Sequence, residues 1–167
     1  MTARLWYPQL DIYDTVRRIA LALQYFSDAP GKERLRIVDF YLANPQLIHY
    51  TSMCREVRNS FRALKIERPD KAFISYPSPQ LLFSKMGPIQ NDAIVEMYSK
   101  ELLSRRDYEN GYMKPTKLCS LLYPIHTMAT TGELKICDFL VNQFASKSEV
   151  SNIDLRKRTG LRKVIYL

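Results

Sequence analysis

The feature of this sequence that most limits its fold is the helical spacing of its apolar residues between breaks at proline and glycine. From Asp11 to Phe26, apolar side chains return every three or four residues, and Asp11 is placed to cap the start of a helix. A second run follows the break at residues 28–31 and stops at Asn44 and Pro45. The same pattern recurs after Ser52, after Pro88, and within residues 118–128 and 134–144. The sequence therefore predicts a mainly α-helical protein.

One segment departs from this pattern. Asn110 and Gly111 are flanked by Tyr108 and Tyr112, and Asn-Gly is the dipeptide that best accepts the positive φ angles of a tight hairpin turn. We expect a short β-hairpin near residues 103–115 with this pair in its turn. Helices that lead into a hairpin and then resume are typical of a winged-helix-like unit, which is the fold class we predict. A helical domain with an incidental hairpin would give the same pattern.

The length of 167 residues fits one compact domain. Within residues 1–167 we distinguish N-terminal helices (1–70), the winged-helix-like part (71–117) and C-terminal helices (118–167). Pro124 is expected to kink or restart the helix around it, and Gly160 to stop a short basic helix that begins at Ser151. Short extended pieces are predicted at residues 72–76 and 164–167.

Nothing in the sequence directs export. The first eight residues carry one arginine and no apolar core of a signal peptide, and no apolar run approaches the ~18 residues of a membrane span. Three widely spaced cysteines, Cys54, Cys119 and Cys137, favour reduced and buried thiols over a disulfide framework. We therefore predict a cytoplasmic protein without membrane contact.

The parts of a catalytic site are missing from the sequence. There is no glycine-rich phosphate loop, GxSxG, HExxH or CxxC motif, and neither His49 nor His126 has a ligand-type neighbour at metal-binding spacing. Arg55 and Arg58 could activate Cys54 as a nucleophile, but packing beside apolar neighbours is the favoured interpretation. We predict no enzymatic activity, no metal and no other cofactor. Three carboxylates are assigned to caps or surface salt bridges: Asp11, Asp14 and Asp39.

The formal charge of +8 is concentrated in three segments. Residues 51–71, 104–117 and 146–167 carry +3, +2 and +4. Such clusters suit contact with nucleic acid, although an acidic protein partner or solubility would explain them equally well.

The third predicted helix carries the most ordered of these charges. Four cations at i, i+3, i+7 and i+10 share an arc away from its apolar side, and they are Arg55, Arg58, Arg62 and Lys65. The C-terminal basic helix adds Arg156, Lys157 and Arg158. We take these residues as candidates for binding nucleic acid or an acidic partner. A solvated helix face is the alternative.

Several segments resemble a known family. They are WYPQLDIYDTVRR at residues 6–18, ERLRIVDFY at 33–41, MGPIQ at 86–90 and NGY at 110–112. They are similar to the middle-component proteins of bacterial three-component ABC-type defence systems, the accessory subunits of Lamassu-type anti-phage systems. The resemblance implies a non-catalytic subunit beside an SMC-like ABC ATPase and a separate effector, often a nuclease. It implies no individual site residue, because the shared positions are packing and turn residues.

Three functions remain to be compared. An accessory subunit would bridge the ATPase and the effector, and whether it contacts DNA stays open. A winged-helix transcription regulator is the alternative, but the helix in its recognition slot carries Asp92, Glu96 and Glu101 against Lys100 alone, which suits a phosphate-lined groove poorly. A hydrolase or nuclease would need carboxylates from distant segments to converge, and the sequence offers no support for that. We favour the accessory subunit.

Overall fold

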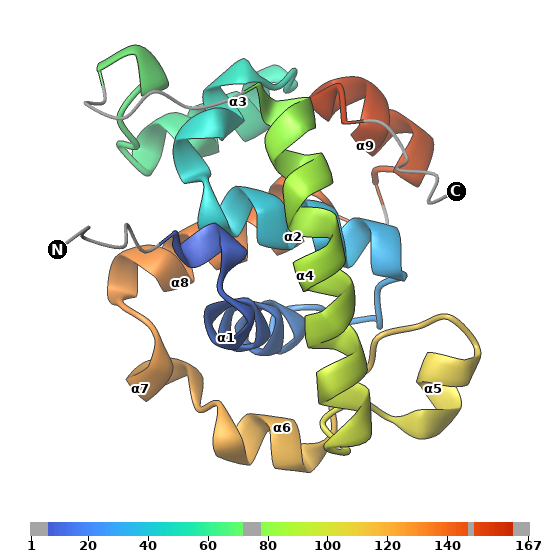
Figure 1. Cartoon of the computed structure of the whole chain (residues 1–167). Coiled ribbons are helices and arrows are strands. Elements are labelled where there is room, and N and C mark those ends of the chain that lie inside the picture. The colour runs from blue at the N-terminus through green and yellow to red at the C-terminus, as the bar shows by residue number, and fades with distance from the viewer. Residues whose placement is uncertain (1–6, 72–77, 147–148, 162–167) are drawn as a thin grey trace, which may run out of the picture.

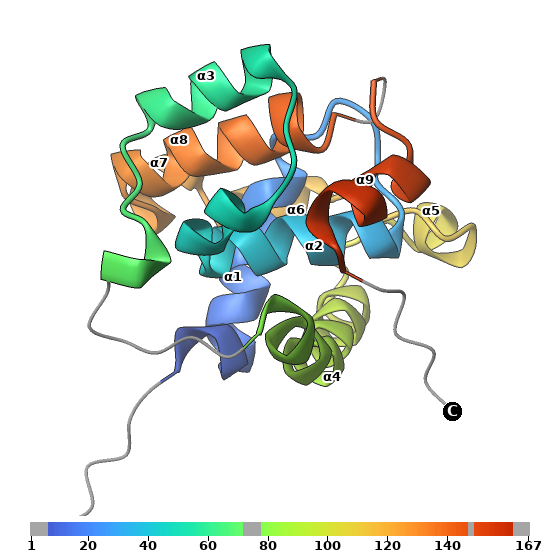
Figure 2. The same ribbon diagram turned by 90° about the horizontal axis from the view of Figure 1, so that it is seen from above.

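Two buried helices pass through the middle of the molecule, and the other helices cover them (Figures 1 and 2). This computed structural model describes residues 7–71, 78–146 and 149–161. Its elements are η1 (Pro8–Leu10), α1 (Ile12–Leu23), α2 (Lys32–Ala43), η2 (Pro45–Tyr50), α3 (Arg55–Ala63), η3 (Pro69–Lys71), α4 (Pro79–Ser99), α5 (Arg105–Glu109), α6 (Lys117–Leu122), α7 (Ile125–Met128), α8 (Thr131–Phe139), the π-helical η4 (Leu140–Phe144) and α9 (Asn152–Thr159). The predicted mainly helical class is confirmed.

The central pair, α1 and α2, forms as the sequence predicts. Asp11 caps α1, where its carboxylate accepts a hydrogen bond from the Asp14 backbone N–H at 2.9 Å. Asn44 ends α2 immediately before Pro45. Most residues of both helices are buried, and α1 packs against α2 and α4. Buried apolar residues from Val16 to Leu161 form one cluster that draws on all three predicted segments of the chain.

The long helix α4 corrects the prediction that a helix begins at Pro88. It begins nine residues earlier, because the Ser78 hydroxyl caps it by accepting from the Leu81 N–H at 3.2 Å, and Pro79 occupies its first turn. Pro88 lies inside the helix with its ring exposed. The cost of the missing hydrogen bond at Pro88 is offset by buried side chains before and after it, including Phe83 and Met97.

The predicted hairpin and winged-helix unit are wrong. The described residues contain no β-strand, and residues 105–109 form the short helix α5 instead. Ser104 caps this helix, and Asn110 follows it with φ −87° rather than the positive angle that a tight hairpin turn requires. Of the two residues of the dipeptide, only Gly111 has positive φ, at 85°. The flanking segments do meet, in an isolated bridge between Leu103 and Pro115.

Two further predictions are settled by the helix boundaries. The helix around Pro124 does restart there, because α6 ends at Leu122 and α7 begins at Ile125. Gly160 does stop the basic helix α9, with φ 68° in the left-handed region. The extended pieces predicted at residues 72–76 and 164–167 lie outside the described residues. No helix in the described ranges is long and apolar enough to cross a membrane.

Two individual residues differ from expectation. Cys119 and Cys137 are buried as predicted, but Cys54 is exposed, because it is the N-cap position of α3 and has left the apolar side of that helix. Asp39, assigned from sequence to the surface, is fully buried. Its carboxylate accepts a hydrogen bond from Arg18 Nε at 2.8 Å and another from Gln90 Nε2 at 2.8 Å, so it joins α1, α2 and α4 in the core.

Candidate functional site

The basic face of α3 is a surface of the folded protein. Phe61 is the only buried residue of this helix, and its ring lies 5.7 Å from that of Phe139 on α8. Val57 is partly buried against the same core, so one side of α3 packs on the protein and the opposite side is open to solvent. Arg55, Arg58 and Arg62 are exposed on it. They have the i, i+3 and i+7 relation that the sequence predicts.

Lys65, the fourth member of the predicted stripe, is exposed but is not on the helix. The helix ends at Ala63, with Leu64 as its C-cap, and Lys65 has φ 54°. Its backbone N–H donates to the Arg62 carbonyl at 3.1 Å, which closes the helix with a tight turn. The predicted helix therefore ends several residues early, and the spacing argument holds for the three arginines of α3 only.

A hollow of about 380 Å³ lies beside these arginines, between α3, η2 and the loop that follows α3. The residues that line it include three arginines and no acidic residue; they are His49, Thr51, Met53, Arg58, Phe61, Arg62 and Arg68. Within the described ranges, Arg58 and Arg62 form no ion pair, and Arg68 has only a long one of 3.8 Å to the exposed Asp70. Three guanidinium groups around one hollow, without carboxylates in its lining, favour an anionic occupant.

The histidine in this hollow has a fixed ring. His49 Nε2 lies 2.8 Å from the Ile66 carbonyl oxygen, so Nε2 carries the proton and donates it. The ring also contacts Phe61 edge-on, with centroids 4.8 Å apart. His49 thus links η2 to the loop after α3, and its ring packs against α3 through Phe61.

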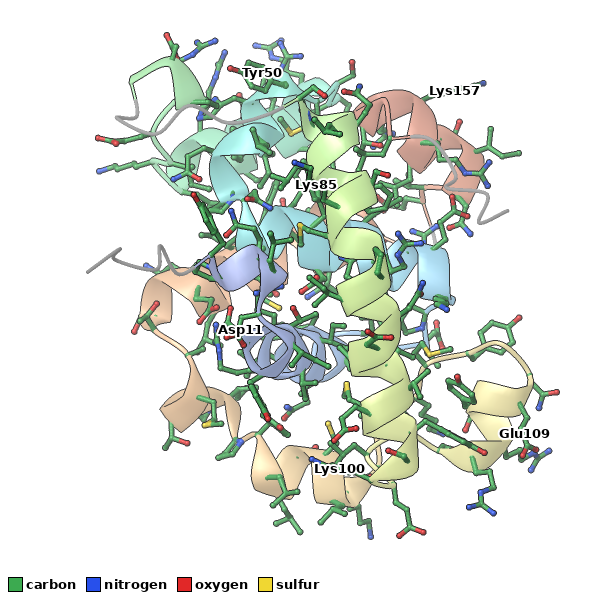
Figure 3. All side chains as sticks on the ribbon, viewed as in Figure 1. Asp11, Tyr50, Lys85, Lys100, Glu109 and Lys157 are labelled. Atoms are coloured by element: carbon green, nitrogen blue, oxygen red, sulfur yellow. The ribbon has the colours of Figure 1, made fainter. Side chains whose placement is uncertain are left out.

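The C-terminal basic residues have different environments. Arg156 forms an ion pair with Glu33 of α2, and this contact uses its guanidinium within the fold. Lys157 is exposed and points away from the body of the molecule in Figure 3. The backbone of Arg158 lies next to the segment before α3, because its carbonyl accepts from the Ser52 N–H at 2.9 Å. The segment before α3 and the end of α9 are therefore neighbours in space, and Arg156 itself is paired with Glu33.

The hollow contains two residues that the sequence did not indicate, His49 and Arg68. His49 comes from η2 and Arg68 from the loop after α3, so the helical spacing of α3 cannot find them. The excess of basic residues in 51–71 was the one signal that included Arg68. Groups of three His, Cys, Asp or Glu that could hold a metal ion are absent from the described part of the chain.

The fold and this surface define a mainly helical protein with a basic face suited to an anion. Comparison with family models goes further: the chain belongs to the family described as ABC-three component (ABC-3C) system Middle Component 5, whose model matches residues 4–166. The resemblance seen in the sequence is thereby confirmed. Membership of a middle-component family is consistent with the role of an accessory subunit, and it implies that the chain has partner subunits. No curated protein and no solved structure gives a significant match.

Proposed function

We propose that this middle component is a non-catalytic accessory subunit of a Lamassu-type anti-phage complex, where it bridges an SMC-like ABC ATPase and a nuclease-like effector. In the same proposal, the basic face of α3 contacts the phosphate backbone of DNA held by the complex. The observation that carries the DNA contact is the hollow lined by Arg58, Arg62 and Arg68 without a carboxylate.

Of the two possible occupants of this hollow, phosphate fits better than a flat surface of a partner protein. Guanidinium groups bind phosphate oxygens through paired N–H donors, and several of them on one rigid helix engage successive phosphates without separate ordering. Thr51 adds a polar side chain to the lining, and Phe61 is too deeply buried to stack on a base. We therefore expect contact with the backbone and no preference for sequence.

The lack of catalysis is supported by the side chains available. Of the three thiols, only Cys54 is exposed, and burial raises the pKa of Cys119 to about 11 and that of Cys137 to about 12. Neutral, buried thiols are poor nucleophiles. We expect no turnover of nucleic acid or nucleotide by the isolated chain. Nuclease activity that disappears on changing one residue of this chain would contradict the proposal.

The test is a charge reversal on α3 in the assembled complex. Arg58→Glu with Arg62→Glu should weaken DNA binding at least about tenfold for every sequence tried, and reduce the slope of log affinity against log salt by about two. The matched control is Arg105→Glu with Arg106→Glu, because these arginines are also exposed but lie on α5, away from α3 (Figure 1). The control should bind DNA like the wild type.

Two other results have clear meanings. If the α3 variant fails to assemble with its partner subunits while its own melting temperature is unchanged, the basic face contacts an acidic protein surface and the DNA part of the proposal is wrong. If the wild-type chain does not co-purify with the ATPase or the effector at micromolar concentration, the bridging role is wrong.

A further inference from the structure

The second surface that stands out is helix α6. This helix buries only Cys119, while Leu118, Leu121 and Leu122 are 40%, 74% and 55% exposed. Three exposed leucines on one helix of six residues form a contiguous apolar face. Single exposed leucines are ordinary on a protein surface, but a cluster of this kind indicates a contact with another molecule.

The chain around this helix is also free of charge. No Asp, Glu, Lys or Arg occurs in residues 118–132, which cover most of α6, all of α7 and the start of α8, whereas 25% of the whole chain is charged. A solvated helix normally carries charged residues on its outer face. Depletion of charge around exposed apolar side chains is instead a property of interface cores.

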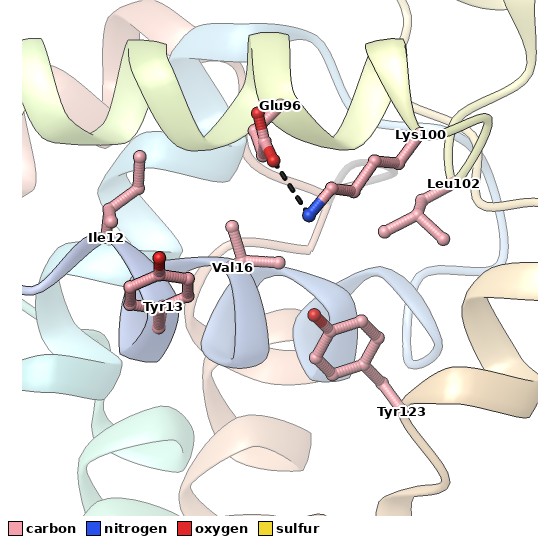
Figure 4. Close-up of a pocket in the computed structure, with 7 residues that line it drawn as sticks. All are labelled: Ile12, Tyr13, Val16, Glu96, Lys100, Leu102 and Tyr123. Atoms are coloured by element: carbon pink, nitrogen blue, oxygen red, sulfur yellow. Dashed lines mark ion pairs between the residues drawn. The ribbon is translucent and has the colours of Figure 1, made fainter.

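A groove lies at the C-terminal end of α6, where Tyr123 forms part of its lining. It has a volume of about 220 Å³, and Ile12, Val16 and Leu102 form its apolar lining between α1 and α4 (Figure 4). Tyr13, which is 81% exposed, and Tyr123, the C-cap of α6, lie toward its two ends. The Gln24 side chain donates to the Tyr123 carbonyl at 2.9 Å, so α6 is tied to α1 and the groove is preformed.

The two charged groups of the groove are paired with each other. Lys100 Nζ lies 2.8 Å from Glu96 Oε1 along the α4 wall. An apolar side chain can therefore enter beside this ion pair without having to neutralise a free charge. Aromatic walls around an apolar floor are the usual setting for an anchor residue of a docked helix.

The size of this surface bears on what binds it. Tyr13 and the three leucines expose on the order of 500 Å², less than the about 800 Å² per partner that a standard interface buries. The patch is thus too small to hold a homodimer together by itself, but it suits one helix of a partner that makes other contacts. Membership of a multi-subunit family supplies such partners.

We infer that α6 and the Tyr13 groove form a docking surface for an amphipathic helix of a partner subunit, with an apolar anchor in the groove and further apolar residues on the α6 leucines. This inference rests on the proposed function, and it adds the place on this chain where a partner subunit binds. In Figure 1, α6 lies at the opposite end of the molecule from α3, so both surfaces are accessible at once.

Photo-crosslinking tests the inference directly. A benzophenone amino acid at position 121 is incorporated into the chain, which is co-expressed with the ATPase and the effector; position 153 on α9 is the control, because Ile153 is 61% exposed but lies outside the patch. We expect position 121 to crosslink to an apolar-faced helix of one partner subunit and position 153 to give at least about tenfold less product. Crosslinks only to a second copy of this chain, or equal yields at the two positions, would overturn the inference.

A pair of variants gives the second readout. Leu121→Asp with Leu122→Asp should lower capture of one partner at least about tenfold. Raising the salt concentration should neither restore capture by this variant nor weaken capture by the wild type. The control, Leu81→Asp with Ile153→Asp, changes apolar residues of similar exposure elsewhere and should leave capture unchanged. If the wild type captures its partners and the α6 variant does so equally well, the inference alone fails. If the wild type captures neither, the proposed function fails with it.

Discussion

A buried ion pair is the residue-scale feature that sets the geometry of the core. Arg18 is almost fully buried, and its guanidinium donates to Asp39, to the Thr15 hydroxyl and to Asp14. Burial alone would lower the pKa of Arg18, but the charges of Asp39 and Asp14 outweigh it and the pKa is raised. The buried guanidinium of Arg18 and the carboxylate of Asp39 each need their hydrogen-bond partners. The ion pair therefore restricts how α1 and α2 can pack.

Breaking this pair should be far more damaging than replacing it. Asp39→Ala leaves a buried guanidinium without its main acceptor, so we expect the free energy of unfolding to fall by about 3–5 kcal/mol. The double change Arg18→Met with Asp39→Leu should recover most of that loss. Urea unfolding followed by circular dichroism measures both, with Glu96→Gln in the exposed Lys100 pair as a control that changes stability by less than about 0.5 kcal/mol. Equal losses in the single and double variants would contradict the argument.

The buried thiols predict how stability depends on pH. The folded pKa values are about 11 for Cys119 and about 12 for Cys137, against 9.0 for an unperturbed thiol, and burial is the main cause of both shifts. Above pH 9 the unfolded chain loses protons that the folded chain keeps, so stability falls as pH rises, by up to about 1.4 kcal/mol per unit per thiol. Unfolding curves between about pH 8.5 and 10 should therefore decline less steeply for Cys119→Ala with Cys137→Ala than for the wild type. Identical slopes would show that the thiols do not contribute.

At the scale of single elements, the φ angles of the turn after α5 distinguish the end of a helix from a hairpin turn. A tight hairpin turn would need positive φ at both Asn110 and Gly111, whereas only Gly111 has it. Asn110→Ala should therefore change stability by less than about 0.5 kcal/mol, and Gly111→Ala should cost about 1 kcal/mol through backbone strain. A Cβ at Gly111 would meet no atom within 4 Å, so steric overlap cannot confuse the result. Thermal unfolding of the two variants gives the comparison.

The elements that the sequence predicted well are those with local signals at both ends. Helix α1 has its cap at Asp11, and α2 stops before Pro45. Helix α5 was misassigned because Asn-Gly is a strong turn signal, while the competing cap at Ser104, whose hydroxyl accepts from the Asp107 N–H, is weaker in sequence. In the candidate site, Arg58 and Arg62 could be found from helical spacing. His49 and Arg68 could not, because only tertiary packing brings η2 and the loop after α3 to the side of that helix.

At the scale of the whole molecule, arginines tie the outer helices to the central pair. Arg17 on α1 donates to both carboxylate oxygens of Glu133 on α8, at 2.9 Å each. Arg34 on α2 donates to the Ala145 carbonyl at 2.6 Å and to the side chain of Asn152 in α9. Part of the positive charge of the chain is therefore used in contacts within the fold. The exposed arginines of α3 stand out because, among the described residues, none of them forms an ion pair; Arg58 donates only to the Met53 carbonyl, at 3.4 Å.

The basic face of α3 and the apolar surface of α6 should act independently. The arginines of α3 and the leucines of α6 lie at opposite ends of the molecule and share no side-chain contact among the residues described (Figure 1). Changes at distant sites without common partners add within about 0.5 kcal/mol. A double-mutant cycle combines the α3 change, Arg58→Glu with Arg62→Glu, and the α6 change, Leu121→Asp with Leu122→Asp. The combined variant should therefore lose as much DNA affinity as the α3 variant alone and as much partner capture as the α6 variant alone.

The two losses should also differ in their response to salt. Binding through α3 releases counterions and should weaken steeply between about 0.05 and 0.2 M salt, whereas capture through the apolar α6 surface should change little over that range. The wild type, the α3 variant, the α6 variant and the combined variant are each titrated with DNA and with the purified partner subunit. These titrations measure the affinity for DNA and the affinity for the partner. A coupling energy above about 1 kcal/mol would mean that one partner spans both ends of the molecule, and a bridge with two separate contacts would then be the wrong description.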